Sequence, residues 1–262
     1  MLPARVVLQR SIAGSMVFMF LISGAIMAIV YYIAIWFQAV KDNSATDAGI
    51  HTIPLVLGMV VFGIVAAKFT ERVGYYVPGM LVSPVFCAVG AGLLSAMTPA
   101  TSKGFWIGMQ VLFGLGLGCG FQQSNLAAQN VLPREDVPIG MALVFFMQQL
   151  GGSVFLAVSQ NIFSARLVER LAGVSGLDTQ RIVNTGATEI RKVVPPEALG
   201  AVVNAYNYAI TRVFLMAAIL SAVMILAAAV VEWKSIKGKN GAGGAPKSAE
   251  DRDEEAETEV KK

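Results

Sequence analysis

The chain has 262 residues, of which 55% are hydrophobic and only 14% are charged, and its formal net charge is +3. A soluble domain usually carries about 25% charged residues, so this composition argues against a soluble enzyme and against a disordered protein. The small net charge argues against nucleic acid as a partner. We therefore predict an all-α integral membrane protein whose main partner is the lipid bilayer, where helices satisfy their own backbone hydrogen bonds.

Six apolar stretches are long enough to cross a hydrocarbon core about 30 Å thick. None of them contains Asp or Glu, and Lys and Arg occur only near their ends. The predicted spans are residues 12–37, 53–69, 77–97, 105–127, 139–163 and 210–231. The sequence thus predicts a six-span bundle over residues 12–231.

The connector between the last two spans, residues 164–209, is longer than the others and is predicted to be extracellular. Its segments 165–171 and 179–194 are amphipathic. Pro195-Pro196-Glu197 is typical of a helix start, so we expect the last helix to begin there, outside the membrane. Arg212, close to the start of the last span, is interpreted as a residue that extends its charge toward the membrane surface.

Both ends of the chain are predicted to be cytoplasmic. An even number of spans places the N-terminal segment, residues 1–11, and the tail, residues 232–262, on the same side. Lys and Arg near the span ends are more frequent on that side, as is usual for cytoplasmic segments. The tail is rich in Gly and in charged residues, which predicts disorder.

Glycines in the fourth and fifth spans are predicted to serve helix packing or bending. In the fourth span they alternate with larger residues and form two Gly-x-x-x-Gly pairs, a spacing that lets a neighbouring helix approach closely. This run lacks the Gly-x-Gly-x-x-Gly spacing of a nucleotide-binding loop. The glycines concerned are Gly114, Gly116, Gly118, Gly120, Gly151 and Gly152.

The residues that usually carry enzyme chemistry are scarce. His51 is the one histidine of the chain, and Cys87 and Cys119 both lie within apolar runs. No nucleophile–base pair and no metal-ligand pattern can be recognised. We expect no cofactor, no metal and no enzymatic activity.

Uncharged polar side chains recur at helical spacing within three of the spans. Such side chains are unfavourable against lipid, so they are predicted to face other helices or a watery cavity. Interhelical hydrogen bonding is one interpretation, and a cavity that binds uncharged or aromatic solutes is the other. The candidate substrate-pathway residues are Tyr31, Gln38, Gln122, Gln123, Asn125, Gln129, Gln148, Gln149 and Gln160.

Several motifs resemble the C-terminal half of a major facilitator superfamily carrier, in particular of the fungal fourteen-span drug:H⁺ antiporters. They lie within residues 116–125, 128–133, 146–152 and 232–235. The resemblance implies a six-helix half-bundle made of two inverted three-helix repeats, with the substrate bound between two halves of the carrier. It also implies an N-terminal transporter half, a small organic substrate, protons as the coupling ion, and the plasma membrane rather than the vacuolar membrane.

The connector Glu71-Arg72-Val73-Gly74 resembles a degenerate copy of the superfamily's Gly-x-x-x-Asp-Arg-x-Gly-Arg loop. Ala67 stands in place of the first glycine and Tyr75 in place of the last basic residue. The resemblance implies a degenerate gating loop formed by Glu71, Arg72 and Gly74. A solvated connector without a gating role is the alternative.

These observations lead to two hypotheses about function. The first is that the chain is half of a proton-coupled efflux permease that exports small amphipathic organic molecules, such as a drug, a toxin or a secondary metabolite. The second is a truncated, non-transporting membrane protein or a packing partner of another permease. The spans contain no carboxylate that could carry a proton, so proton coupling is expected to depend on residues outside this chain.

Overall fold

The computed structural model describes residues 4–172 and 194–233, and every regular element in these ranges is a helix. Six helical segments are long and apolar enough to cross a membrane, which confirms the predicted all-helical membrane class. The predicted disordered tail beyond Trp233 and most of the predicted amphipathic segment 179–194 lie outside the described residues.

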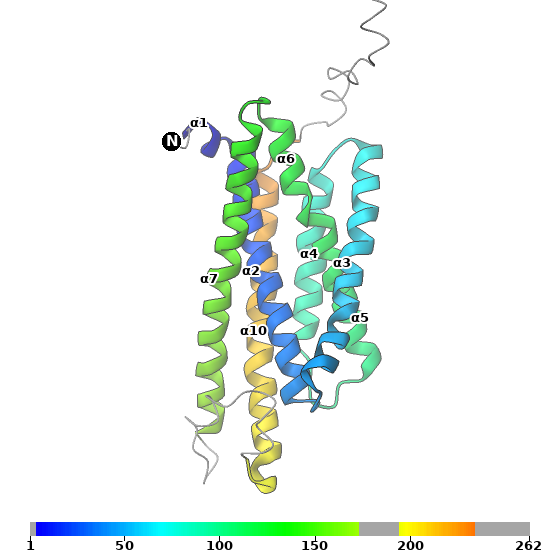
Figure 1. The fold of residues 1–262 in the computed structure, drawn as a ribbon, viewed down its shortest axis with the longest axis vertical. Coiled ribbons are helices and arrows are strands. Elements are labelled where there is room, and N and C mark those ends of the chain that lie inside the picture. Colours follow the sequence, from blue (N-terminus) through cyan, green and yellow to red (C-terminus); the bar gives the residue numbers. More distant parts are fainter. Residues whose placement is uncertain (1–3, 173–193, 234–262) are drawn as a thin grey trace, which may run out of the picture.

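The helices run side by side along the long axis of the molecule (Figure 1). In chain order they are α1 (Ala4–Val7), α2 (Arg10–Ala39), α3 (Ala45–Val73), α4 (Val77–Leu94), α5 (Lys103–Phe121), α6 (Gln123–Val131), α7 (Val137–Leu171) and α10 (Pro196–Val230). Helices α5 and α6 together form the fourth membrane-spanning segment. In the view of Figure 1, α7 and α3 lie at opposite edges of the bundle.

Local sequence signals fix several helix ends. Ser44 accepts a hydrogen bond from the Asp47 N–H (3.1 Å) and caps the start of α3, the usual role of a serine at this position. Gly74 ends α3 in the left-handed conformation (φ 83°), where a residue with a Cβ is strained. Helix α10 begins at Pro196, which confirms the helix start predicted from the Pro195-Pro196-Glu197 sequence.

The structure adds two features to the predicted spans. The fourth segment is interrupted at Gln122, whose N–H points to the carbonyl of Gly120 instead of making the regular helical bond. Helix α7 continues beyond Phe163 to Leu171, and α10 also extends into the predicted connector 164–209. The amphipathic segment 165–171 is therefore the end of α7, with Leu167 and Leu171 buried.

The packing of the helices has an internal two-fold pattern. Helix α5 packs against α3 and α4, and α2 packs in the same way against α7 and α10, while α4 and α10 contact each other. Exchanging α2 with α5–α6, α3 with α7, and α4 with α10 therefore maps these main contacts onto one another. This is the arrangement expected of two inverted three-helix repeats.

Burial is uneven among the helices. In the most apolar 18-residue stretch of α2, 61% of the residues are buried, whereas the corresponding values are 11% for α3 and 22% for α7. The core consists of large side chains with almost no exposed surface, including Trp36, Tyr32, Phe18, Phe113 and Phe214. Helices α3 and α7 thus present most of their apolar surface to whatever surrounds the bundle.

Candidate functional site

Close helix contacts set the positions of the polar side chains. A Cβ at Gly118 of α5 would lie 2.5 Å from the Met59 carbonyl oxygen of α3, and a Cβ at Gly116 would lie 2.6 Å from the Cys87 backbone nitrogen of α4. Gly114 likewise faces the backbone of α3, and Gly120 faces Ser83 of α4. The two Gly-x-x-x-Gly pairs therefore lie against two different helices and bring α3, α5 and α4 together.

The adjacent glycines of α7 lie against α2. A Cβ at Gly151 would collide with the Phe20 backbone, and one at Gly152 would lie 3.1 Å from the Ser23 hydroxyl oxygen. The rings of Phe20 and Phe155 meet edge to face with their centroids 5.3 Å apart. This close approach places the polar residues of α7 beside those of α2.

Tyr31 and Gln160 both contact the buried residue Tyr32. The Tyr32 hydroxyl donates a hydrogen bond to the Gln160 Oε1 atom across the α2–α7 contact (2.8 Å). Tyr31 is 50% exposed, and its ring packs edge to face on Tyr32 at a centroid distance of 5.3 Å. Further along α2, Gln38 is half-buried.

On α7, Gln149, Ser153 and Gln160 share one stripe and are exposed, while Gln148 is half-buried. The Ser153 hydroxyl donates to the Gln149 carbonyl (2.9 Å) within the same helix. Gln149 and Gln160 thus lie on one side of α7, the side on which Gln160 contacts Tyr32 of α2.

The two polar stripes predicted for the fourth segment have different environments. Gln122 and Gln129 are exposed, and Asn125 is half-buried. Gln123 is only 1% exposed, and its Nε2 atom donates to the Thr70 hydroxyl of α3 (3.2 Å). Gln123 therefore joins α6 to α3, and this position favours a packing role over the predicted pathway role.

We use the term polar face for the eight predicted pathway residues that are exposed or half-buried, which are all of the predicted set except Gln123. Helix α2 packs against both α6 and α7, so this helix connects the other contributions. The polar face consists of Tyr31, Gln38, Gln122, Asn125, Gln129, Gln148, Gln149 and Gln160. It combines amides and a phenol and carries no charged side chain, so it is suited to uncharged polar and aromatic groups.

The predicted connector Glu71-Arg72-Val73-Gly74 is the last turn of α3 and its C-cap rather than a loop. Glu71 and Arg72 are exposed, and neither forms an ion pair with another described residue. The Gly74 N–H donates to the Thr70 carbonyl (2.8 Å), so Gly74 serves as the C-cap of α3. Nothing in these contacts singles out a gating interaction.

Two polar contacts were missed by the sequence analysis because their partners are far apart in the chain. Arg5 pairs with Asp136 (3.0 Å), whose side chain is 9% exposed, and so ties α1 to the start of α7. The Trp36 indole N–H donates to Asn207 Oδ1 (2.8 Å), which joins α2 to α10. Helical periodicity within one segment cannot indicate a pair whose two members lie in distant segments.

Comparison with known proteins identifies the family. The sequence profile of the Major Facilitator Superfamily matches residues 2–156. The chain belongs to the Major Facilitator Superfamily. The superfamily predicted from the sequence motifs is thereby confirmed.

Its similarity to named superfamily members extends over most of its length. It is 45% identical over 238 residues to the MFS-type efflux pump MFS1 of Arthroderma benhamiae, a match that covers 90% of this chain and 44% of that protein. It is 44% identical over 237 residues to the efflux pump aflT of Aspergillus parasiticus, covering 90% and 46%. For the MFS-type transporter VdtG of Byssochlamys spectabilis the identity is 45% over 236 residues, covering 90% and 42%. This superfamily chain spans about half the length of the curated relatives it matches.

Proposed function

We propose that the chain forms half of a proton-coupled efflux permease that exports small amphipathic organic molecules, and that the polar face lines one wall of its pathway. The observation that carries the proposal is the exposure of several uncharged amides within otherwise apolar helices. Exposed amides are unfavourable against acyl chains. A water-filled cavity that admits polar groups of a solute removes this penalty.

The relatives support an export function, since two of them are named efflux pumps. Their names describe those proteins, and their greater length supports the proposal that a second bundle completes the carrier. The low burial of α3 and α7 in this chain (11% and 22%) supports the same idea, because these helices have wide apolar surfaces available for contact. The substrate would then bind between this bundle and an N-terminal one, near the middle of the membrane.

Proton coupling is proposed to depend on the other half. Among the described residues, Asp and Glu occur only near helix ends or in connectors, as illustrated by Asp47 in the first turn of α3 and Glu169 near the end of α7. A proton-carrying acid normally lies within the membrane beside the pathway. We place that acid in the N-terminal half, whereas the amides of this half bind the solute.

The proposed carrier lies in the plasma membrane, with both ends of this chain in the cytoplasm. The distribution of Lys and Arg near the span ends supports this orientation. In this orientation the α6–α7 connector is cytoplasmic, and the end of α7 and the start of α10 are on the opposite side.

The pathway proposal is tested by replacing Gln122 and Gln129 together with leucine in the complete carrier. Two lost hydrogen bonds to a solute at about 1 kcal/mol each predict roughly 30-fold slower efflux. Efflux of a fluorescent amphipathic compound is measured from cells with equal carrier levels. The matched control is Asn204→Leu, which removes an exposed amide from α10, outside the polar face. Efflux that equals that of the control would show that the two glutamines do not line the pathway.

A further inference from the structure

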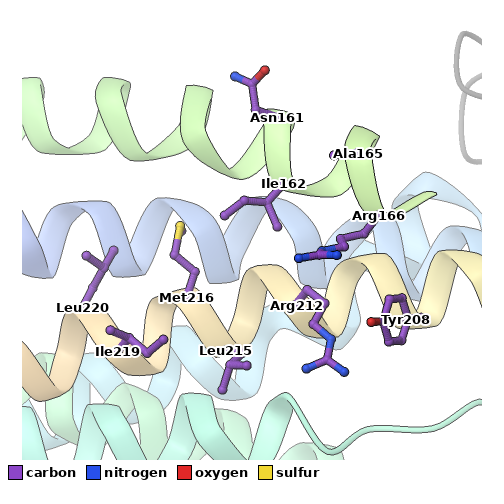
Figure 2. A pocket seen from close by; sticks show the side chains of 10 residues that line it. All are labelled: Asn161, Ile162, Ala165, Arg166, Tyr208, Arg212, Leu215, Met216, Ile219 and Leu220. Atoms are coloured by element: carbon purple, nitrogen blue, oxygen red, sulfur yellow. The ribbon is translucent and has the colours of Figure 1, made fainter. Parts of the chain in front are cut away.

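A groove between α7 and α10 lies outside the polar face. It has a volume of about 940 Å³, and the described residues that line it all belong to these two helices, among them Ile162, Arg166, Arg212 and Met216. In Figure 2, Ile162 points from α7 into the gap, and Met216 and Leu220 point from α10 toward α7. The ribbon of α2, which packs against both helices, runs between them in this view.

The groove is on a different side of α7 from the polar face. Its α7 residues Asn161 and Ala165 are four positions apart and form one stripe. Gln149, Ser153 and Gln160 form another stripe, turned by about 100° because Gln160 and Asn161 are successive residues of one helix. A molecule bound in the groove would therefore lie against the outside of the bundle rather than in the proposed pathway.

The two ends of the groove differ in chemistry. Tyr208 and Arg212 are followed on the same face of α10 by apolar side chains at helical spacing, with Arg166 of α7 beside the polar end (Figure 2). The apolar part consists of Leu215, Met216, Ile219 and Leu220. Leu215 is 38% exposed and Ile219 is 58% exposed, so this part offers an open apolar surface next to a cationic end.

The cationic end has more guanidinium groups than carboxylates. Arg166 pairs with Glu169 (2.7 Å) on the exposed surface of α7. The guanidinium groups of Arg170 and Arg212 both lie over the Tyr208 ring, with their Cζ atoms 3.9 Å and 4.6 Å from the ring centroid. Among the residues that the structure describes, neither of these two arginines pairs with a carboxylate. The described residues at this end of the groove therefore carry a net positive charge that suits an anionic group.

We propose that the groove binds a membrane phospholipid, with its phosphate against Arg212 and Arg166 and an acyl chain along the apolar part of α10. A guanidinium group matches the geometry and charge of a phosphate. At about 1.5 Å per residue, the distance from Arg212 to Leu220 is roughly 12 Å along the helix. This length is close to the hydrocarbon depth of one leaflet, about 15 Å. Charge and length together identify a lipid rather than a free solute.

The proposal depends only on the membrane location of the chain, so it can fail or succeed independently of the transport proposal. The complete carrier is purified in detergent and titrated with dioleoyl phosphatidylglycerol, and native mass spectrometry counts the bound lipids. We expect one retained lipid, and Arg166→Gln with Arg212→Gln should weaken its binding roughly tenfold or more, as expected for charged hydrogen bonds. Arg134→Gln is the matched control, because Arg134 is exposed in the α6–α7 connector. Equal lipid binding by the double variant and the control would overturn the proposal.

A second variant tests the acyl-chain part while keeping both arginines. Met216→Trp fills the gap toward α7 and should also release the lipid; retention at the parent level would overturn the proposed acyl position. Two further ligands separate the contributions of head group and chain. Dioleoylglycerol lacks the phosphate and should bind more weakly than phosphatidylglycerol, and inorganic phosphate should not displace the lipid at equal concentration. Equal binding of the two lipids, or displacement by phosphate alone, would contradict a phospholipid site.

Discussion

At the scale of single residues, Trp36 and Asn207 show how one amide holds three segments together. Trp36 is completely buried, and its indole N–H donates to Asn207 Oδ1 of α10 (2.8 Å). The Asn207 Nδ2 atom donates in turn to the Met97 carbonyl, just beyond the end of α4 (3.0 Å). Both ends of the carboxamide are thus used, and the contact fixes α2 and α10 relative to the connector that follows α4.

Asn207→Leu is predicted to destabilise the protein. The substitution leaves the Trp36 indole N–H and the Met97 carbonyl without this partner, and an unsatisfied buried polar group costs about 1–3 kcal/mol. The thermal unfolding midpoint of the detergent-purified carrier should therefore fall. Asn204→Leu, at an exposed position one helical turn earlier, should leave the midpoint nearly unchanged. The interpretation of Asn207 would be wrong if both variants unfolded at the same temperature.

Gln122, Gln123 and Arg212 show which properties of a single residue cannot be predicted from the sequence. Helical spacing correctly separated Gln122 and Gln123 into two stripes, because successive helical residues are about 100° apart. It could not show which stripe is buried, since this depends on Thr70, 53 positions away in α3. Arg212 is a similar example. Its position near a span end was predicted, but its contact with the ring of Tyr208 and the neighbouring Arg170 required the structure.

At the scale of elements, the spacing of glycines in α5 decides how close its neighbours come. Gly114 and Gly118 face α3, whereas Gly116 and Gly120 face α4. Because the glycines alternate along α5, two of its sides lack side chains, and both α3 and α4 can approach its backbone closely. The same helix also contains Gly108, where an added Cβ would meet no atom within 4 Å. These positions provide a matched comparison within one element.

Gly118→Ala and Gly108→Ala are predicted to change stability in opposite directions. At Gly118 the new Cβ would lie 2.5 Å from the Met59 carbonyl oxygen and 2.6 Å from the Gly63 nitrogen, so α3 and α5 must separate, at a cost of about 1–3 kcal/mol. At Gly108 the alanine should stabilise the helix by about 0.5–1 kcal/mol. Thermal unfolding in detergent measures both changes. A Gly118→Ala protein as stable as Gly108→Ala would contradict the close packing of α3 and α5.

Hydropathy predicted the number and approximate positions of the elements because lipid selects long apolar segments. It did not predict the end of α7, since apolarity decreases after Phe163 while the helix continues to Leu171. Leu167 and Leu171 are buried on one side of this extension, and contacts with neighbouring elements are what sustain it. The interruption at Gln122 was also missed, because a local change in backbone hydrogen bonding leaves no hydropathy signal.

At the scale of the whole molecule, the two-fold pattern relates the two least buried helices, α3 and α7. They occupy equivalent places in the two repeats and lie at opposite edges of the bundle in Figure 1. A second bundle that contacts both of them would cover the polar face between them. The distribution of burial therefore supports the proposal of a two-half carrier, as does the greater length of the relatives.

A bulky substitution on the exposed side of α3 is predicted to disturb this assembly. Ile64 is 55% exposed, on the side of α3 opposite Leu55 and Ala66, which are buried. In the complete carrier Ile64→Trp should lower efflux roughly tenfold, because overpacking an interface costs about 1–3 kcal/mol. Leu226→Trp on α10 is the control: Leu226 is 66% exposed, and its side chain is proposed to face lipid, which adapts to the larger group. Efflux at equal carrier levels is compared for the two variants. If Ile64→Trp transported as well as Leu226→Trp, α3 would not contact the second bundle at this position, and its exposed side would face lipid instead.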